Sequence, residues 1–211
     1  MSVQKTTLLI AGFLMAGLLI ALPVQAGEFV EGEHYEPLDR DLSDEPEVIE
    51  FFWYGCGTCN MFTPIIEEWH AQLPEGVNFR RVPAVVNPQW ATHGKAYYIA
   101  EALGIEDQMH EYIFDAMHNQ GNRLADLDAV RDLFVEAGVD GEEFDNAAES
   151  FQVDSQMRRA ENLARRYGIR GTPTVIINDR YRTGPREAGG LDRILEVADY
   201  LIEQHPESPA D

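Results

Sequence analysis

Two cysteines, Cys56 and Cys59, directly follow a short apolar run, and they are the only cysteines in the 211-residue chain. The run, Val48 to Tyr54, is rich in bulky residues, which is typical of a buried central strand. After it the sequence changes to helical spacing. A Cys-x-x-Cys pair at a strand-to-helix junction is the usual setting for reversible dithiol–disulfide chemistry. The motif therefore predicts a redox-active pair on an α/β fold.

A helix that begins near Cys56 places both cysteines on one face. Residues i and i+3 of a helix have Cβ atoms ~5–6 Å apart, and a small adjustment brings such a pair within disulfide range. Free amides and the positive end of the helix dipole favour an anion at the helix N-terminus. The pKa of a cysteine there falls from about 8.5 to between ~3.5 and ~7.5. We therefore predict an exposed thiolate at Cys56 and a shielded, resolving thiol at Cys59.

Other uses of the pair remain open. An inert disulfide staple would stabilise the fold weakly, because the loop that it closes is very short. A zinc half-site would need two further Cys or His ligands, and the chain offers no other cysteine and no convincingly spaced histidine pair. Met109-His110 and Met117-His118 combine ligand types that copper accepts, although this spacing is more typical of helix packing. The sequence predicts no metal and no cofactor.

Residues 1–26 have the pattern of a secretory signal peptide. Lys5 precedes an apolar run over about residues 8–22, and the Val-Gln-Ala sequence at residues 24–26 supplies the small residues that a signal peptidase recognises. A membrane anchor is the alternative, because the run approaches the length of a bilayer span. Pro23 and the small residues after it favour cleavage. We predict export to a bacterial periplasm, where disulfides persist.

The charge of the chain is strongly negative. It holds 16 Lys and Arg against 37 Asp and Glu, a formal net charge of −21 at pH 7. This balance argues against nucleic-acid binding and against docking on anionic lipid. The acidic residues are spread along the sequence, which is typical of a well-hydrated surface.

The remaining pattern predicts an α/β domain interrupted by helices. Apolar residues recur every four positions over residues 56–73, at Met61, Ile65, Trp69 and Leu73. The further expected elements are a strand at 77–86, helices from 88 to 167, a strand at 174–177 with a hairpin partner, and a helix at 190–203.

The block of helices is too long for a simple crossover between strands, so we expect a helical domain inserted into the α/β domain. The expected division is a signal peptide at 1–26, a first part of the α/β domain at 27–90, the inserted helical domain at 91–165, a second part of the α/β domain at 166–205 and an acidic tail at 206–211.

The segment Glu50-Phe-Phe-Trp-Tyr-Gly-Cys-Gly-Thr-Cys59 resembles the active-site strand and turn of the DsbA-type periplasmic thiol–disulfide oxidoreductases. Four further segments resemble that family in the same order, namely Leu73–Val77, Ala102–Asp107, Ala137–Phe144 and Arg170–Val175. The resemblance extends over nearly the whole chain after the signal. It implies a thioredoxin fold with a helical domain inserted between the second strand and a cis-proline hairpin.

The resemblance implies roles for the matched residues. Cys56 would form the mixed disulfide with substrate, and Cys59 would complete the exchange. Thr172 and Pro173 would form a cis-proline loop that faces the dithiol and offers backbone groups to an extended substrate. An ordinary proline at the start of a strand is the alternative for Pro173.

Glu50 is an acid within the apolar strand, and a charged group there is costly unless it is paired. The resemblance implies a buried acid with a raised pKa that relays a proton to Cys59. Arg81, on the next strand, is the expected partner. A glutamate at the strand end that faces water is the alternative.

Gly57 and Thr58 depart from the family, whose members usually carry Pro-His between the cysteines. Threonine offers a hydroxyl but no charge. A less stabilised thiolate means a less stable reduced form and hence a weaker oxidant. These two residues are therefore expected to tune the redox pair.

The sequence thus predicts a dithiol oxidase that introduces disulfides into unfolded or partly folded exported proteins. The resemblance implies reoxidation by a quinone-linked membrane partner of the DsbB type. A periplasmic reductase or isomerase on the same fold is the alternative, and a non-enzymatic binding module is a third hypothesis. A DsbC-type isomerase needs an N-terminal dimerisation domain, and only residues 27–55 would precede Cys56, so we expect a monomer.

Overall fold

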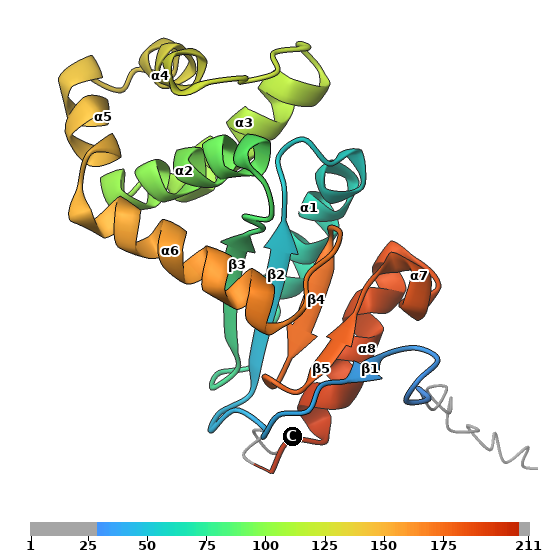
Figure 1. Cartoon of the computed structure of the whole chain (residues 1–211). Helices are drawn as coiled ribbons and strands as arrows, with labels where there is room; N and C mark the ends of the chain where they lie inside the picture. Colours follow the sequence, from blue (N-terminus) through green and yellow to red (C-terminus); the bar gives the residue numbers. More distant parts are fainter. Residues whose placement is uncertain (1–28, 207–211) are drawn as a thin grey trace, which may run out of the picture.

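A mixed sheet carries the dithiol. The computed structural model describes residues 29–206 (Figure 1), so the predicted signal peptide and nearly all of the predicted tail lie outside the described residues. The strand order is β1-β5-β4-β2-β3. The central strand β2 (Glu47–Phe52) is parallel to β3 (Asn78–Pro83) and antiparallel to β4 (Thr174–Ile177). The strands β5 (Tyr181–Thr183) and β1 (Glu36–Pro37) continue the antiparallel side.

The sequence of β2 explains its central place. Its residues after Glu47 are buried, as expected of a strand covered on both faces. On one face, α1 (Gly57–His70) and α8 (Leu191–Glu203) contact each other and cover Val48 and its neighbours. On the other face, Phe51 packs against Tyr167 at the end of α6.

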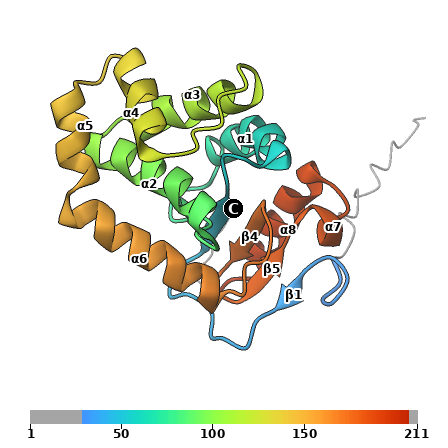
Figure 2. The ribbon, with the colours of Figure 1, turned by 45° about the horizontal axis from the view of Figure 1, so that its top comes forward.

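A block of helices separates β3 from β4, as the sequence predicts, and it consists of five helices (Figures 1 and 2). Side-chain caps fix where several of them begin, because the oxygen atoms of Asn87, Asp126, Asp140 and Ser150 accept from free amides of the first turn. The five are α2 (Pro88–Leu103), α3 (Glu106–His118), α4 (Leu127–Glu136), α5 (Gly141–Ala148) and α6 (Phe151–Arg166).

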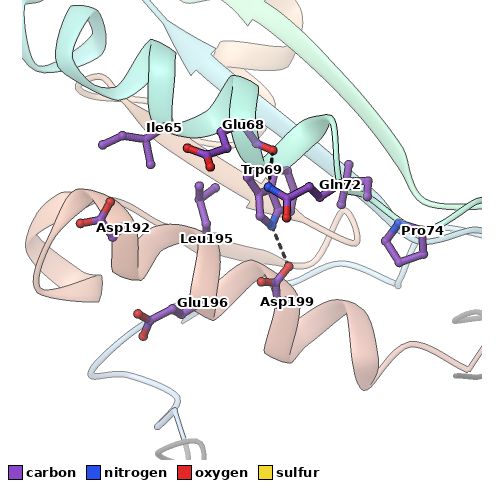
Figure 3. A pocket seen from close by; sticks show the side chains of 10 residues that line it. Ile65, Glu68, Trp69, Gln72, Pro74, Asp192, Leu195, Glu196 and Asp199 are labelled. Atoms are coloured by element: carbon purple, nitrogen blue, oxygen red, sulfur yellow. Dashed lines mark hydrogen bonds between the residues drawn. The ribbon is translucent and has the colours of Figure 1, made fainter.

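The predicted apolar stripe of α1 is only partly its core face. The fully buried residues of this helix are Cys59, Phe62, Thr63 and Ile66. Met61, which the stripe included, is 58% exposed. Ile65, Trp69 and Leu73 are half-buried and line a surface pocket of about 500 Å³ between α1 and α8 (Figure 3). Two rows of apolar residues thus lie side by side on α1. The row predicted from residues four positions apart is the outer one, and the row that contains Phe62 and Ile66 faces the core.

This architecture is the thioredoxin fold with a helical insertion. The β2–α1–β3 unit supplies the parallel pair, and a cis peptide bond at Thr172–Pro173 directly precedes the antiparallel strand β4. The helices α2 to α6 lie between β3 and β4, where the sequence places the insertion. Between residues 29 and 206, none of the helices is long and apolar enough to cross a bilayer.

Candidate active site

Cys56 is the N-cap of α1 and lies just after the end of β2. Its backbone is extended (φ −94°, ψ 112°), and its Sγ accepts a hydrogen bond of 3.2 Å from the Cys59 amide. Gly55 shapes the turn before it, because a Cβ at this position would lie 2.3 Å from the Trp53 ring. The end of the central strand therefore delivers Cys56 to the open end of the helix, where amides lack intrahelical partners.

The surroundings of Cys56 stabilise its thiolate. The thiol of Cys59 donates to it, and with the hydroxyl of Thr172 and the amides of Cys59 and Thr58 this outweighs partial burial and lowers the pKa of Cys56 to about 5. Cys56 therefore carries a negative charge at neutral pH. Among the described residues, none of the main contributors to this stabilisation is a histidine.

Cys59 lies one helical turn deeper, in the opposite surroundings. It is fully buried, and burial, followed by the neighbouring Cys56, raises the pKa of its thiol well above the ordinary range. Its carbonyl accepts a hydrogen bond of 3.0 Å from the Thr63 hydroxyl. Both cysteines are free, so the structure is that of the dithiol form.

The loop before β4 faces this dithiol. The Thr172–Pro173 peptide is cis, as the resemblance implies, and the Thr172 carbonyl oxygen lies 3.3 Å from Cys56 Sγ, close enough to accept a hydrogen bond from the protonated thiol. The Thr174 hydroxyl donates to the Gly171 carbonyl (2.9 Å) and holds the loop in place. Cys56 and Thr172, which are far apart in the sequence, are thus in contact at the active site.

Glu50 is buried beneath the pair and contacts Arg81. The two residues are register partners on the parallel strands β2 and β3. Glu50 Oε2 lies 3.3 Å from Arg81 Nε, but neither atom has a well-directed hydrogen-bond partner within residues 29–206. Burial therefore outweighs the attraction of Arg81 and raises the pKa of Glu50 to about 7. Arg81 is thus the partner that the sequence predicts for Glu50, and the pKa of Glu50 is shifted in the predicted direction.

Glu67, which the sequence reasoning missed, shares Arg81 with Glu50. An oxygen of its carboxylate accepts from the Arg81 guanidinium, and its side chain is 36% exposed. The chain Glu50–Arg81–Glu67 thus leads from the buried layer to the surface. Helical spacing could have indicated Glu67, because it lies one turn after Thr63, which faces the interior.

Gly57 and Thr58 form the first turn of α1. Gly57 is exposed, and a Cβ there would meet nothing within 4 Å. Thr58 is half-buried, and its amide contributes to the low pKa of Cys56. The backbone of this turn therefore contributes to the stabilisation of the Cys56 thiolate.

The inserted helices also contact the active-site turn through residues that the sequence did not indicate for this purpose. The ring of His118, on α3, donates from Nε2 to the Tyr54 carbonyl (2.7 Å). The hydroxyl of Tyr54 lies 3.1 Å from Nδ1 of the buried His110. Burial and the nearby Arg81 lower the pKa of His110 to about 3, so this ring is neutral at neutral pH. Both histidines thus hold the turn that ends in Cys56.

In the part of the chain that the structure describes, no group of three or more His, Cys, Asp or Glu side chains is arranged to hold a metal ion. Met109 is packed in the hydrophobic core beside His110, which agrees with helix packing at this spacing.

A dithiol at a helix N-terminus, opposite a cis-proline on a thioredoxin fold, defines a thiol–disulfide oxidoreductase. Comparison with known proteins gives the family. Residues 65–201 match the family model of the DSBA-like thioredoxin domain. Thiol:disulfide interchange protein DsbA of Azotobacter vinelandii is 41% identical over 206 residues, which cover 93% of this chain and 96% of that protein. Its counterpart in Pseudomonas aeruginosa strain PAO1 is 35% identical over 201 residues, covering 93% and 95%.

Solved structures agree with these relatives. The crystal structure of Pseudomonas aeruginosa DsbA matches with a TM-score of 0.79 at 36% identity, covering 83% of this chain and 94% of that chain. A Proteus mirabilis DsbA in complex with a non-covalently bound peptide matches with a TM-score of 0.70 at 26% identity, covering 82% and 98%. The chain belongs to the DsbA family of thiol:disulfide interchange proteins, which are protein-disulfide oxidoreductases.

Proposed function

We propose that this protein introduces disulfides into exported proteins by donating a Cys56–Cys59 disulfide. The observation that carries the proposal is the low pKa of Cys56, about 5. A thiolate stabilised in the folded protein stabilises the reduced form, and a stable reduced form makes the disulfide a stronger oxidant. Gly57 and Thr58 therefore tune the pair without removing its oxidising character.

The exchange proceeds in two steps. A substrate thiolate attacks Cys56 Sγ, the Cys56–Cys59 bond breaks, and Cys59 leaves with the electron pair. A second substrate thiolate then attacks the substrate sulfur of the mixed disulfide, and Cys56 leaves as a thiolate. The substrate loses two electrons and two protons, and this protein gains its dithiol.

Glu50 manages the proton of Cys59 in this scheme. The high pKa of Cys59 means that its departing thiolate must be protonated, and that the thiol must lose a proton when the disulfide is restored. A buried carboxyl whose pKa is about 7 suits both directions near neutral pH. Arg81 holds Glu50 in position, so we place it among the tuning residues with Gly57 and Thr58.

We further propose that Thr172 and Pro173 bind substrate as an extended segment beside Cys56. The Thr172 carbonyl is within hydrogen-bond distance of the reactive sulfur, and a related DsbA binds a peptide. The substrates would be unfolded or partly folded exported proteins. The protein would act as a periplasmic monomer, after cleavage of residues 1–26, with residues 91–165 as the inserted domain and 206–211 as an acidic tail. A DsbB-type membrane protein would reoxidise it.

The redox equilibrium with glutathione tests this proposal. The protein should be largely reduced at glutathione ratios that leave thioredoxin oxidised, because thioredoxin has a potential of about −270 mV and strong oxidants of this kind lie near −120 mV. A potential near that of thioredoxin would overturn the oxidase function and favour a reductase. Refolding of a scrambled-disulfide protein without added oxidant would test the isomerase function.

A further inference from the structure

A pocket of about 440 Å³ lies beside the cis-proline loop, on the side of β4 that faces β5 and α7 (Pro185–Ala188). Thr172 and Pro173 line one side of it. The segment from Gly184 to Glu187 lines the other, and a Cβ at Gly184 would lie 3.4 Å from the Pro173 carbonyl. The pocket therefore borders the loop that meets the reactive cysteine.

Three arginines line this pocket, Arg170, Arg182 and Arg186. Arg182 is engaged, because it donates to the carbonyls of Tyr167 and Gly168 and pairs with Glu36. Arg170 and Arg186 are exposed, and among the described residues neither has an ion-pair or hydrogen-bond partner. Two guanidinium groups are thus free to bind a ligand.

The carboxylates that line the same pocket are Glu36, which is paired with Arg182, and Glu187. Three arginines against two glutamates give the pocket a positive balance, although the whole chain carries a formal charge of −21. A positive site on a negative molecule attracts anionic groups, and the negative surface around it repels them. The charge of this pocket therefore differs in sign from that of the chain as a whole.

We infer that this pocket selects substrates that carry an acidic residue close to the reactive cysteine. This inference rests on the proposed function. Arg170 lies two residues before Thr172, whose carbonyl is 3.3 Å from Cys56 Sγ. A substrate cysteine bonded to Cys56 therefore brings its neighbouring side chains to the pocket. The guanidinium fork matches a carboxylate in geometry and charge, so the group recognised is the carboxylate of Asp or Glu.

The expected preference is modest and sensitive to salt. The two arginines together should change kcat/KM by about fivefold, which corresponds to about 1 kcal/mol in total, as expected of weak exposed ion pairs. The effect should appear mainly in KM, because the pocket binds a neighbouring side chain and does not touch the sulfur atoms. Salt at molar concentration should abolish most of it, since the Debye length falls to about 3 Å.

The experiment measures oxidation of matched dithiol peptides by the disulfide form of the full-length mature protein. Each peptide carries Glu, Gln or Lys at a single position, either directly before or directly after the reactive cysteine. The wild type should prefer Glu over Gln, and Gln over Lys, at one or more of these positions. The double variant Arg170→Gln and Arg186→Gln should lose this ranking, whereas Arg158→Gln on α6, which does not line the pocket, should keep it.

Equal kcat/KM for the Glu and Gln peptides with the wild type would overturn the inference. So would a preference for Glu that survives in the double variant. Failure of the proposed function is a separate result, because the wild type would then oxidise none of the peptides, the Gln peptides included.

Discussion

The two cysteines of the motif lie one helical turn apart but in opposite surroundings. Cys56 caps the open end of α1, where hydrogen bonds lower its pKa to about 5. Cys59 is fully buried, and burial raises its pKa well above the ordinary range. The same type of side chain is thus a stable thiolate at Cys56 and a persistent thiol at Cys59. Position in the helix thus gives the two residues the different properties that the proposed attack and resolution steps require.

The buried layer beneath the two cysteines, formed by Glu50 and Arg81, also differs from the immediate surroundings of Cys56. Around Cys56, the Cys59 thiol and neutral hydroxyl and amide donors stabilise a charge. Below it, Glu50 and Arg81 are two charged residues whose contact is poorly directed, so the proton on Glu50 is exchangeable near pH 7. The surroundings of Cys56 therefore stabilise a thiolate, and the buried layer holds a carboxyl that suits the proposed proton transfer.

The largest effects should come from removing either cysteine. Cys56→Ser should abolish oxidation of a dithiol peptide, lowering its rate by at least about 10³-fold. Cys59→Ser should leave Cys56 reactive and accumulate a mixed disulfide, because the resolving thiol is absent. Peptide oxidation kinetics and mass spectrometry check both results. Mixed disulfides on Cys59 in place of Cys56 would reverse the assignment.

Loss of the buried acid should have the next largest effect. Glu50→Gln should slow the step that protonates or deprotonates Cys59 by at least about tenfold, and it should remove the dependence of that rate on pH near 7. Stopped-flow measurement of reoxidation against pH gives both quantities. Glu67→Gln is the matched control, since it also removes a carboxylate from Arg81 but lies partly at the surface. An equal effect of both variants would show that Arg81, not Glu50, is responsible.

A histidine between the cysteines should sharpen the difference between them. Thr58→His places an imidazole in the first turn of α1, where its charge or hydrogen bond further stabilises the Cys56 thiolate. The glutathione equilibrium should shift toward the reduced protein by about tenfold, which is about 30 mV. Thr58→Val measures the loss of the hydroxyl alone. A shift toward the oxidised protein in Thr58→His would contradict the account of Cys56.

The pH dependence of stability gives a further test of the same thiolate. The pKa of Cys56 falls on folding from about 9 to about 5, so the folded reduced form binds fewer protons than the unfolded chain between these values. This contribution is fully present above pH 9 and is lost as pH falls through 5. The disulfide form has no such thiolate. The urea midpoint of the reduced form should therefore fall relative to that of the disulfide form as pH is lowered from 7 to 4, and a constant difference would contradict this.

The parts of the site that the sequence could predict are those fixed by short-range rules. The dithiol on a helix N-terminus follows from the strand-to-helix transition around Cys56. The contact between Glu50 and Arg81 follows from the pairing of two consecutive parallel strands. The cis bond before Pro173 came from the family resemblance, because an isolated X-Pro bond is cis in only about 5–6% of cases.

The parts that the sequence could not predict depend on tertiary packing. The short β1 strand consists of two exposed residues, Glu36 and Pro37, which carry no apolar pattern. The predicted core face of α1 was wrong in part, because Met61 faces solvent although it has the same helical spacing as the half-buried Ile65. His118 binds the Tyr54 carbonyl from a separate helix, and no local pattern encodes that approach.

The central claim is that Cys56 is a stabilised thiolate and Cys59 a buried thiol. Absorbance of the thiolate near 240 nm, followed against pH in the reduced protein and in Cys59→Ser, tests it most directly. The reduced protein should show a single transition near pH 5 and no second one up to pH 9. A first transition near pH 8.5, the ordinary value for a free cysteine, would contradict the account.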